Sequence, residues 1–182
     1  MPFCPESSLS GVKYTDFINT IWYQRKIDIP AAWNGKKILL NFGAVDYEAH
    51  VFIDGKLVRR HFGTGSSFSC DITKFVKAGQ QHNLVVLVND NLRDHKQPGG
   101  KQSFGFYSAG CNYTRVTGIW QTVWMEAVAE EGLKSVFATP DIDQKQLVIH
   151  PQFYQESNTN KLVVTLYDGK KAVASKTVNC TN

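Results

Sequence analysis

The sequence predicts an all-β protein built from hairpins, and three observations support this prediction. Apolar and polar residues alternate on both sides of Asp54-Gly55, which is the strongest short-range signal for a hairpin with a type I′ turn. Residues 82–89, HNLVVLVN, form a strongly apolar run with the composition of a central strand. No helical periodicity extends beyond a turn or two. We therefore expect strands and turns almost throughout.

Two strands are expected before the central hairpin, at residues 21–29 and 36–42. Pro30 ends the first of them, because proline has no N–H to donate to a sheet. Within the hairpin, Val51 and Ile53 share one face, since side chains alternate along a strand. The register of the hairpin is therefore predicted together with its turn.

Two further features follow the hairpin. Residues 63–67, GTGSS, form a flexible link that lacks the lysine and the following helix of a phosphate-binding loop. Residues 68–72 are expected to form a short strand, and Asp71 is a candidate cap for the turn that begins at Thr73. We expect no phosphate site here.

A strand is also expected at residues 118–128, GIWQTVWMEAV. Because side chains alternate along a strand, Trp120 and Trp124 lie on one face and the apolar residues next to them lie on the other. We expect one of the two tryptophans to pack against the core, so that its replacement by alanine unfolds the domain.

Residues 129–132, AEEG, mark a domain boundary, and we divide the chain into residues 1–130 and 131–182. The second part is expected to contain four strands, at residues 134–138, 146–154, 162–167 and 172–178. Asp168-Gly169 predicts a hairpin between the last two, although Lys170-Lys171 leaves the loop length open. An immunoglobulin-like sandwich needs about seven strands.

The composition excludes several classes of function. The 42% hydrophobic content supports a packed core, and the net charge of +4 is scattered without a basic, aromatic block, which argues against nucleic-acid binding. No apolar run approaches the ~20 residues of a membrane span, and the amino end does not resemble a signal peptide. The four cysteines lie far apart without zinc-ligand spacing, so we expect buried free thiols and no metal site.

Residues 89–112 form a long irregular segment, and such loops are uncommon unless they are functional or disordered. The segment combines many polar side chains with aromatic residues, a combination that suits a sugar, whose hydroxyl groups need hydrogen bonds and whose C–H face stacks on rings. A solvated loop held by its own aromatic residues is an equal alternative. The aromatic residues in and beside the segment are Phe104, Phe106, Tyr107 and Tyr113.

Catalytic machinery is not identifiable in the sequence. Hydrolysis of a glycoside normally requires two carboxyl groups about 5–10 Å apart. Asp46 and Glu48 are expected to project to one face of a strand, and Asp90 and Asp94 lie in the polar loop. Both pairs are explained equally well as solvated strand or loop ends. No serine nucleophile motif is present, and we assign no catalytic residue and no cofactor.

A series of motifs carries a family resemblance. In chain order they are PFCPESSLSG (residues 2–11), WYQR (22–25), FGAVDY (42–47), FSCDIT (68–73), PGGKQ (98–102) and YTRVTGIWQTVWME (113–126). This series resembles the amino-terminal sugar-binding domain of glycoside hydrolase family 2, which includes β-galactosidases and β-glucuronidases. The resemblance covers about residues 1–128, and the remainder resembles the start of the family's immunoglobulin-like domain.

The resemblance implies a jelly-roll (galactose-binding-like) β-sandwich followed by an incomplete immunoglobulin-like β-sandwich. In the family, two catalytic glutamates stand on a later (β/α)₈ barrel, so we expect this chain to be an inactive fragment of a retaining, β-galactosidase-like glycosidase. The first strands of the jelly roll are expected to be missing. The implied partners are a β-galactoside or β-glucuronide and the remaining domains of a periplasmic or secreted parent, with no nucleic acid and no membrane.

The resemblance also implies a site. In the β-galactosidase branch an aspartate after the strand matching residues 82–89 reaches toward the sugar, and Asp90 occupies that position. Lys101 and Gln102 are weaker substrate-binding candidates, and Gly99 stands where the family usually has arginine. A structural cap is the alternative role for Asp90. The alternatives for the whole chain are an autonomous carbohydrate-binding module and a purely structural interaction domain.

Overall fold

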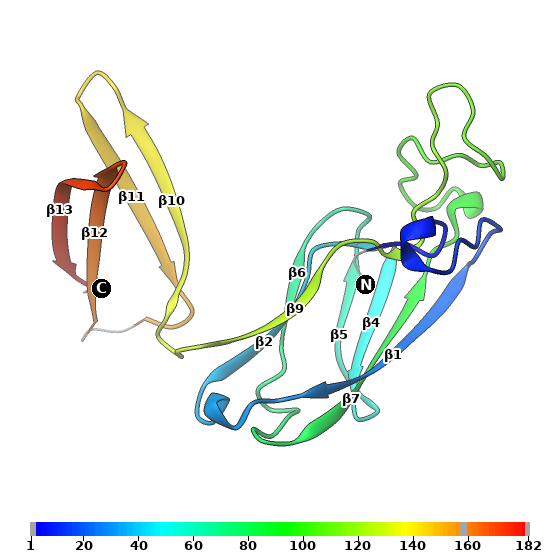
Figure 1. Cartoon of the computed structure of the whole chain (residues 1–182), viewed down its shortest axis with the longest axis horizontal. Helices are drawn as coiled ribbons and strands as arrows, with labels where there is room; N and C mark the ends of the chain where they lie inside the picture. Colours follow the sequence, from blue (N-terminus) through cyan, green and yellow to red (C-terminus); the bar gives the residue numbers. More distant parts are fainter. Residues whose placement is uncertain (1–2, 157–159, 181–182) are drawn as a thin grey trace. The chain divides into compact units, whose positions relative to one another are not determined.

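The computed structural model describes residues 3–156 and 160–180 (Figure 1), so Pro2 of the first family motif lies outside the described residues. The chain divides into two compact units, Met1–Val128 and Ala129–Asn182. Both are built from strands, and the described helices are three 3₁₀ turns, Ser8–Ser10, Ala31–Trp33 and Leu92–Asp94. None of the described helices has the length and apolar character required to cross a membrane. The all-β prediction is confirmed.

The first unit contains two antiparallel sheets that pack face to face. The larger sheet has the order β1 (Thr20–Asp28), β7 (Gln81–Asn89), β4 (Glu48–Ile53), β5 (Lys56–Phe62), and the smaller sheet has the order β6 (Phe68–Asp71), β2 (Lys37–Phe42), β9 (Val123–Val128). A short pair, β3 (Val45–Asp46) and β8 (Gly118–Ile119), adds to them. Strands β1 and β5 are therefore the edges of the larger sheet.

The central hairpin forms as the sequence predicts. Asp54 and Gly55 adopt φ angles of 48° and 78°, which are the left-handed conformations that a type I′ turn requires. Val51 and Ile53 point inward and are fully buried. The hairpin thus supplies one wall of the core.

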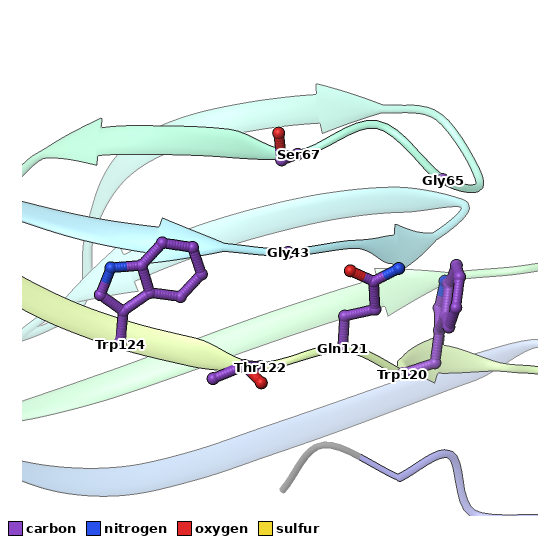
Figure 2. A pocket seen from close by; sticks show the side chains of 7 residues that line it. All are labelled: Gly43, Gly65, Ser67, Trp120, Gln121, Thr122 and Trp124. Atoms are coloured by element: carbon purple, nitrogen blue, oxygen red, sulfur yellow. The ribbon is translucent and has the colours of Figure 1, made fainter. Parts of the chain in front are cut away.

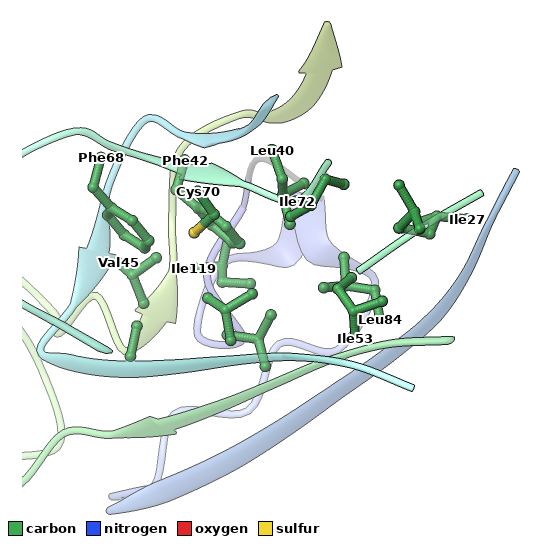
Figure 3. Packing of buried hydrophobic residues seen from close by; sticks show 14 of the residues in the cluster. Ile27, Leu40, Phe42, Val45, Ile53, Phe68, Cys70, Ile72, Leu84 and Ile119 are labelled. Carbon is green, nitrogen blue, oxygen red and sulfur yellow. The ribbon is translucent and has the colours of Figure 1, made fainter. Parts of the chain in front are cut away.

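The core lies between the two sheets (Figure 3). Phe42 of β2 stacks on Phe68 of β6 with ring centroids 4.7 Å apart, and both rings belong to one buried cluster with Val51 and Ile53 of the larger sheet. Burial of this apolar surface is the main source of stability. The buried cluster of the first unit thus draws on both sheets.

The expected packing of Trp120 or Trp124 against this core is wrong. Trp124 is 44% exposed and Trp120 is only partly buried, whereas Ile119, Val123 and Met125 contact the core. Large apolar side chains occur on both faces of this segment. The prediction chose the tryptophans because they are the largest, whereas the structure buries the smaller side chains that alternate with them.

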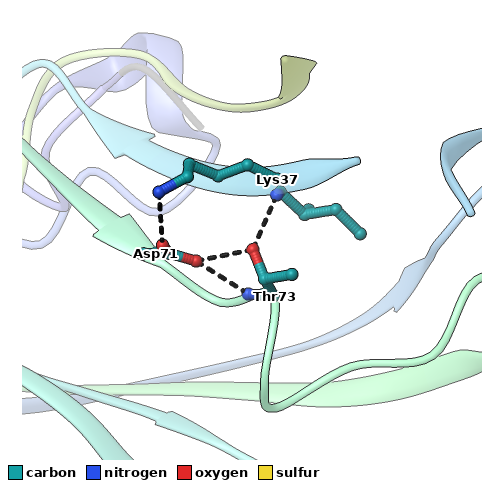
Figure 4. A network of polar contacts seen from close by, with 4 residues as sticks. Lys37, Asp71 and Thr73 are labelled. Atoms are coloured by element: carbon teal, nitrogen blue, oxygen red, sulfur yellow. Dashed lines mark hydrogen bonds and ion pairs between the residues drawn. The ribbon is translucent and has the colours of Figure 1, made fainter. Parts of the chain in front are cut away.

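Asp71 acts as the predicted cap (Figure 4). Its Oδ1 accepts hydrogen bonds from the backbone N–H and the hydroxyl of Thr73, at 3.0 and 2.6 Å. Thr73 Oγ1 in turn accepts from the backbone N–H of Ile38 at 2.9 Å, and Lys37 Nζ lies 3.4 Å from Asp71 Oδ2. The cap therefore joins the end of β6 to β2 and holds a turn.

The second unit consists of two separate antiparallel hairpins. Its strands are β10 (Leu133–Asp141) paired with β11 (Gln146–Phe153), and β12 (Lys161–Asp168) paired with β13 (Lys171–Asn179). All four predicted strands are present. Asp168 pairs with Lys171, so the loop has two residues and Lys171 belongs to the strand. No described residue of this unit is buried.

The four cysteines are unpaired, but the expectation that they are buried is only partly correct. Cys70 lies in the core, Cys4 and Cys180 are partly buried, and Cys111 is exposed. Cys111 lies in the long loop, where the chain has no second layer to cover it.

Candidate functional site

Three buried carboxyl groups gather at the end of the sandwich where β3 and β7 finish. Asp46 ends β3, Asp90 follows β7, and Glu6 belongs to the amino-terminal segment. Their side chains are only 2%, 6% and 6% exposed, respectively. We call this group the carboxyl cluster. Like charges that are buried close together repel one another, which favours the protonated forms of Asp46 and Asp90.

Asp46 is the most deeply buried member of the cluster. Its Oδ2 accepts a hydrogen bond from Gln102 Nε2 at 2.8 Å, while its Oδ1 is buried without a partner among the described residues. Burial, together with the charges of Asp90 and Glu6, raises the pKa of Asp46 to about 7. A carboxyl group with this pKa carries a proton for part of the time at neutral pH, which reduces the repulsion in the cluster.

Gln102 connects the long loop to the carboxyl cluster. Its amide donates to Asp46, and its Oε1 accepts from the backbone N–H of Val116 at 2.8 Å. The side chain is buried and both ends of its amide are occupied. The neighbouring Lys101 is exposed, and its side chain forms no hydrogen bond or ion pair with the cluster among the described residues. The structure therefore links Gln102, but not Lys101, to the buried carboxyl groups.

Asp90 lies where the sequence places it, directly after the central strand. Its backbone N–H donates to the carbonyl of Asn19 at 2.9 Å, and its Oδ1 accepts from Gln97 Nε2 at 2.6 Å. Its other oxygen has no partner among the described residues and is not fully buried. Burial and the charge of Glu6 raise the pKa of Asp90 to about 6, against the hydrogen bond from Gln97 and the charge of Arg115. Asp90 thus presents one fixed, unpaired acceptor at the rim.

Glu6 and Arg115 complete the buried polar network. Both carboxylate oxygens of Glu6 accept hydrogen bonds from Thr117, from its backbone N–H and its hydroxyl. Arg115 donates to the carbonyls of Thr15 and Gly105. These bonds tie the amino-terminal segment and the long loop to the segment before β8.

Sequence reasoning missed Glu6 and Arg115 as members of the site. Both lie within the family motifs, which was the available signal. Their partners are up to 111 residues away, so no local pattern indicates that they are buried together.

The expected carboxylate pairs are not assembled. Asp46 and Glu48 lie on different strands, and Glu48 accepts a hydrogen bond from His50 at 2.6 Å instead. Asp94 is exposed and forms an ion pair with Lys96 at 3.1 Å, whereas Asp90 is buried. The expectation that Asp46 and Glu48 share one face is corrected by the bend between β3 and β4. Among the described residues, no group of three or more His, Cys, Asp or Glu side chains is arranged to hold a metal ion.

The long loop packs against Phe17 of the amino-terminal segment. The guanidinium carbon of Arg93 lies 3.2 Å from the ring centre of Phe17, and that of Arg115 lies 3.7 Å from it. Phe106 packs edge-on against Phe17 at 5.6 Å. The four aromatic residues in and beside the loop that the sequence singles out remain exposed, among them Tyr107 at 78%. The loop is therefore pinned at its base and offers rings to solvent.

The first unit is a two-sheet β-sandwich domain. A family profile described as "Glycosyl hydrolases family 2, sugar binding domain" matches residues 10–126. The chain belongs to glycoside hydrolase family 2 through this domain.

Curated relatives include two kinds of glycosidase. The chain is 28% identical over 131 residues to a β-galactosidase of Thermoanaerobacter pseudethanolicus, covering 71% of this chain and 16% of that protein. It is 26% identical over 177 residues to the β-glucuronidase of Canis lupus familiaris, covering 88% of this chain and 27% of that protein. The chain thus spans less than a third of the length of these relatives.

Solved structures share the fold. A β-glucuronidase of Faecalibacterium prausnitzii superimposes with a TM-score of 0.73 at 22% identity, covering 100% of this chain and 35% of that one. The β-glucuronidase of Ruminococcus gnavus gives a TM-score of 0.70 at 22% identity, covering 90% of this chain and 29% of that one. Both likenesses support the β-sandwich architecture.

Proposed function

We propose that this chain is the non-catalytic sugar-binding and scaffold part of a family 2 glycosidase, in which Asp90 accepts a hydrogen bond from a hydroxyl group of the substrate. The geometry of Asp90 carries the proposal. One carboxyl oxygen is held by Gln97, and the other has no partner among the described residues. A preorganised acceptor at a domain rim binds a hydroxyl group without paying a further ordering cost.

The residues behind Asp90 position it. Gln102 holds Asp46, and a proton on Asp46 lowers the negative charge that faces Asp90. In this proposal Gln102 acts on the sugar through Asp46 and the loop, as a positioning residue. Lys101, exposed on the same loop, is placed to make a second, weaker contact with the substrate.

The proposed parent enzyme hydrolyses an O-glycosidic bond, and its substrate is a β-galactoside or a β-glucuronide. Relatives of both kinds match this chain, and we give the two substrates equal weight. The catalytic acid and nucleophile are proposed to come from another part of the parent, since the carboxyl groups of the cluster are buried in the fold of this domain.

The test uses the full-length protein that contains this chain. We expect Asp90→Asn to lower kcat/KM more than tenfold, about 1.4 kcal/mol of transition-state stabilisation, on 4-nitrophenyl β-galactoside or β-glucuronide, whichever the protein prefers. The melting temperature should hardly change, because asparagine keeps the shape and removes a buried charge.

Asp94→Asn is the matched control, because Asp94 lies in the same loop, is exposed and pairs only with Lys96. It should leave the kinetic constants unchanged. Constants within twofold of wild type for Asp90→Asn would return Asp90 to a structural role. The 182-residue chain alone should hydrolyse neither substrate.

A further inference from the structure

A groove on the outer face of the smaller sheet has the character of a second ligand site. It has a volume of about 710 Å³, within the range of small-molecule sites. It shares no residue with the carboxyl cluster. The lining residues are Gly43, Gly65, Ser67, Trp120, Gln121, Thr122 and Trp124. Figure 2 shows the Gln121 side chain between the rings of Trp120 and Trp124.

The walls of the groove are held in place. Trp120 Nε1 donates to the carbonyl of Thr64 at 2.8 Å, which fixes the indole ring against the loop between β5 and β6. The same loop is held where the backbone N–H of Gly63 donates to the carbonyl of Tyr47 at 3.0 Å. The ring of Trp120 is therefore preorganised, and little side-chain entropy remains to be lost on binding.

Glycine at position 43 lets the Gln121 side chain lie close against the backbone directly after β2. A Cβ atom added there would lie 2.8 Å from both the Cβ and the Oε1 of Gln121. Any larger residue would push the Gln121 side chain out of its position between the two indole rings. Only glycine at position 43 therefore leaves the Gln121 side chain where it lies.

The polar groups in the groove are available to a ligand. The side chains of Ser67, Gln121 and Thr122 have no hydrogen-bond partner among the described residues, and neither does the indole N–H of Trp124. None of the seven lining residues is charged. An amide and two hydroxyl groups offer donors and acceptors without selecting for ionic charge.

We propose that this groove binds a neutral oligosaccharide, with one pyranose ring stacked on Trp124 and its hydroxyl groups bonded to Gln121 and Ser67. Indole rings supply flat apolar area for the C–H face of a sugar, and the amide and hydroxyl groups bond its rim. The two indole rings lie on either side of the Gln121 side chain (Figure 2) and offer two separate stacking surfaces, which suits an oligosaccharide better than a single sugar. The lack of a cation in the lining argues against an acidic sugar.

The experiment titrates the 182-residue chain with cellotetraose, β-1,4-galactotetraose and tetragalacturonate in turn. Calorimetry measures the binding of each. We expect saturable binding of at least one neutral tetrasaccharide and much weaker binding of the acidic one. Trp124→Ala and Gln121→Ala should each weaken binding, the former at least tenfold, with little change in melting temperature because Trp124 is 44% exposed.

Trp22→Ala is the matched control, because Trp22 is an exposed indole on β1 outside this groove. It should leave the affinity unchanged, and so should Asp90→Asn, which separates this site from the one proposed above. The inference is overturned if neither neutral tetrasaccharide binds in a millimolar titration, at sugar concentrations up to about 100 times that of the protein. It is also overturned if the acidic tetrasaccharide binds equally well. Loss of binding in Trp22→Ala but not in Gln121→Ala would also overturn it, since the sugar would then lie between β1 and β9.

Discussion

The two units of this chain are built from the same kind of strand but differ in what covers them. In the first unit the apolar faces of two sheets bury one another, and Phe42 is completely inaccessible to solvent. In the second unit the strands alternate in the same way, yet no described residue is buried and Phe137 is 70% exposed. A two-stranded hairpin without a second layer is marginally stable at best. Alternation therefore predicts a strand, and only packing makes it stable.

The largest expected effect is the difference between equivalent substitutions in the two units. Phe42→Ala should lower the free energy of unfolding by about 3–5 kcal/mol, because it removes a ring from the centre of the core. Phe137→Ala should change it by less than about 0.5 kcal/mol, because little surface is lost. Urea unfolding followed by circular dichroism measures both. Similar losses for the two variants would show that the second unit has a core of its own.

Two glycines with positive φ allow a finer comparison. Gly118 has a φ of 75°, and a Cβ atom there would overlap the hydroxyl group of Tyr23, which accepts from the backbone N–H of Ile119 at 3.2 Å. Gly169, in the β12–β13 turn, has a φ of 57° and open space around it. Both alanine variants carry backbone strain of about 1 kcal/mol, and Gly118→Ala adds a steric clash.

We therefore expect Gly118→Ala to cost about 2–3 kcal/mol of stability and Gly169→Ala about 1 kcal/mol or less. Thermal unfolding of the two variants beside the wild type gives the comparison. An equal loss at both positions would mean that the Tyr23 hydroxyl moves aside without cost.

A pH dependence of stability in the first unit gives a further comparison. The pKa of Asp46 is raised to about 7 in the folded protein, so the folded state holds a proton that the unfolded state releases near pH 4. The free energy of unfolding contributed by this group is therefore highest at low pH and falls as the pH rises to about 7. Asp90, with its pKa raised to about 6, acts in the same direction.

Asp46→Asn should remove the contribution of Asp46. Its stability relative to wild type should rise between pH 5 and pH 7, by up to about 1.4 kcal/mol per pH unit, and then level off. Urea unfolding at pH 5, 6, 7 and 8 measures the difference. Asp94→Asn, an exposed carboxylate, serves as the control. Parallel stability curves for Asp46→Asn and wild type would contradict the raised pKa.

The strands and turns of this fold were predictable because their signals are local. Asp54-Gly55 defines its turn, although the pairing of β4 with β5 shifts by one residue between Val51 and Phe52, and Asp71 bonds a residue only two positions away. Which face of residues 118–128 is buried was not predictable in the same way. Trp120 and Trp124 alternate with smaller apolar residues, and only the opposite sheet determines which set is covered.

The candidate site was predictable only in part, for a related reason. The position of Asp90 directly after an apolar strand was predictable, and its contact with a substrate stays a prediction. Glu6 and Asp46 join it from distant segments, and Gln102 reaches Asp46 across 56 positions in the sequence. Contacts of this length depend on the topology, so the pattern of one sequence does not reveal them.

The unpaired sheet edges have a consequence for the behaviour of this chain at high concentration. An exposed edge strand is a template on which other chains add strands and aggregate, and charged side chains oppose this. Strand β5, an edge of the larger sheet, carries Lys56, Arg59 and Arg60. In the second unit, where each strand of a two-stranded sheet has one unpaired edge, β13 carries Lys171 and Lys176. Repulsion between these cations when two copies meet edge to edge favours the dispersed chain over the fibrous aggregate.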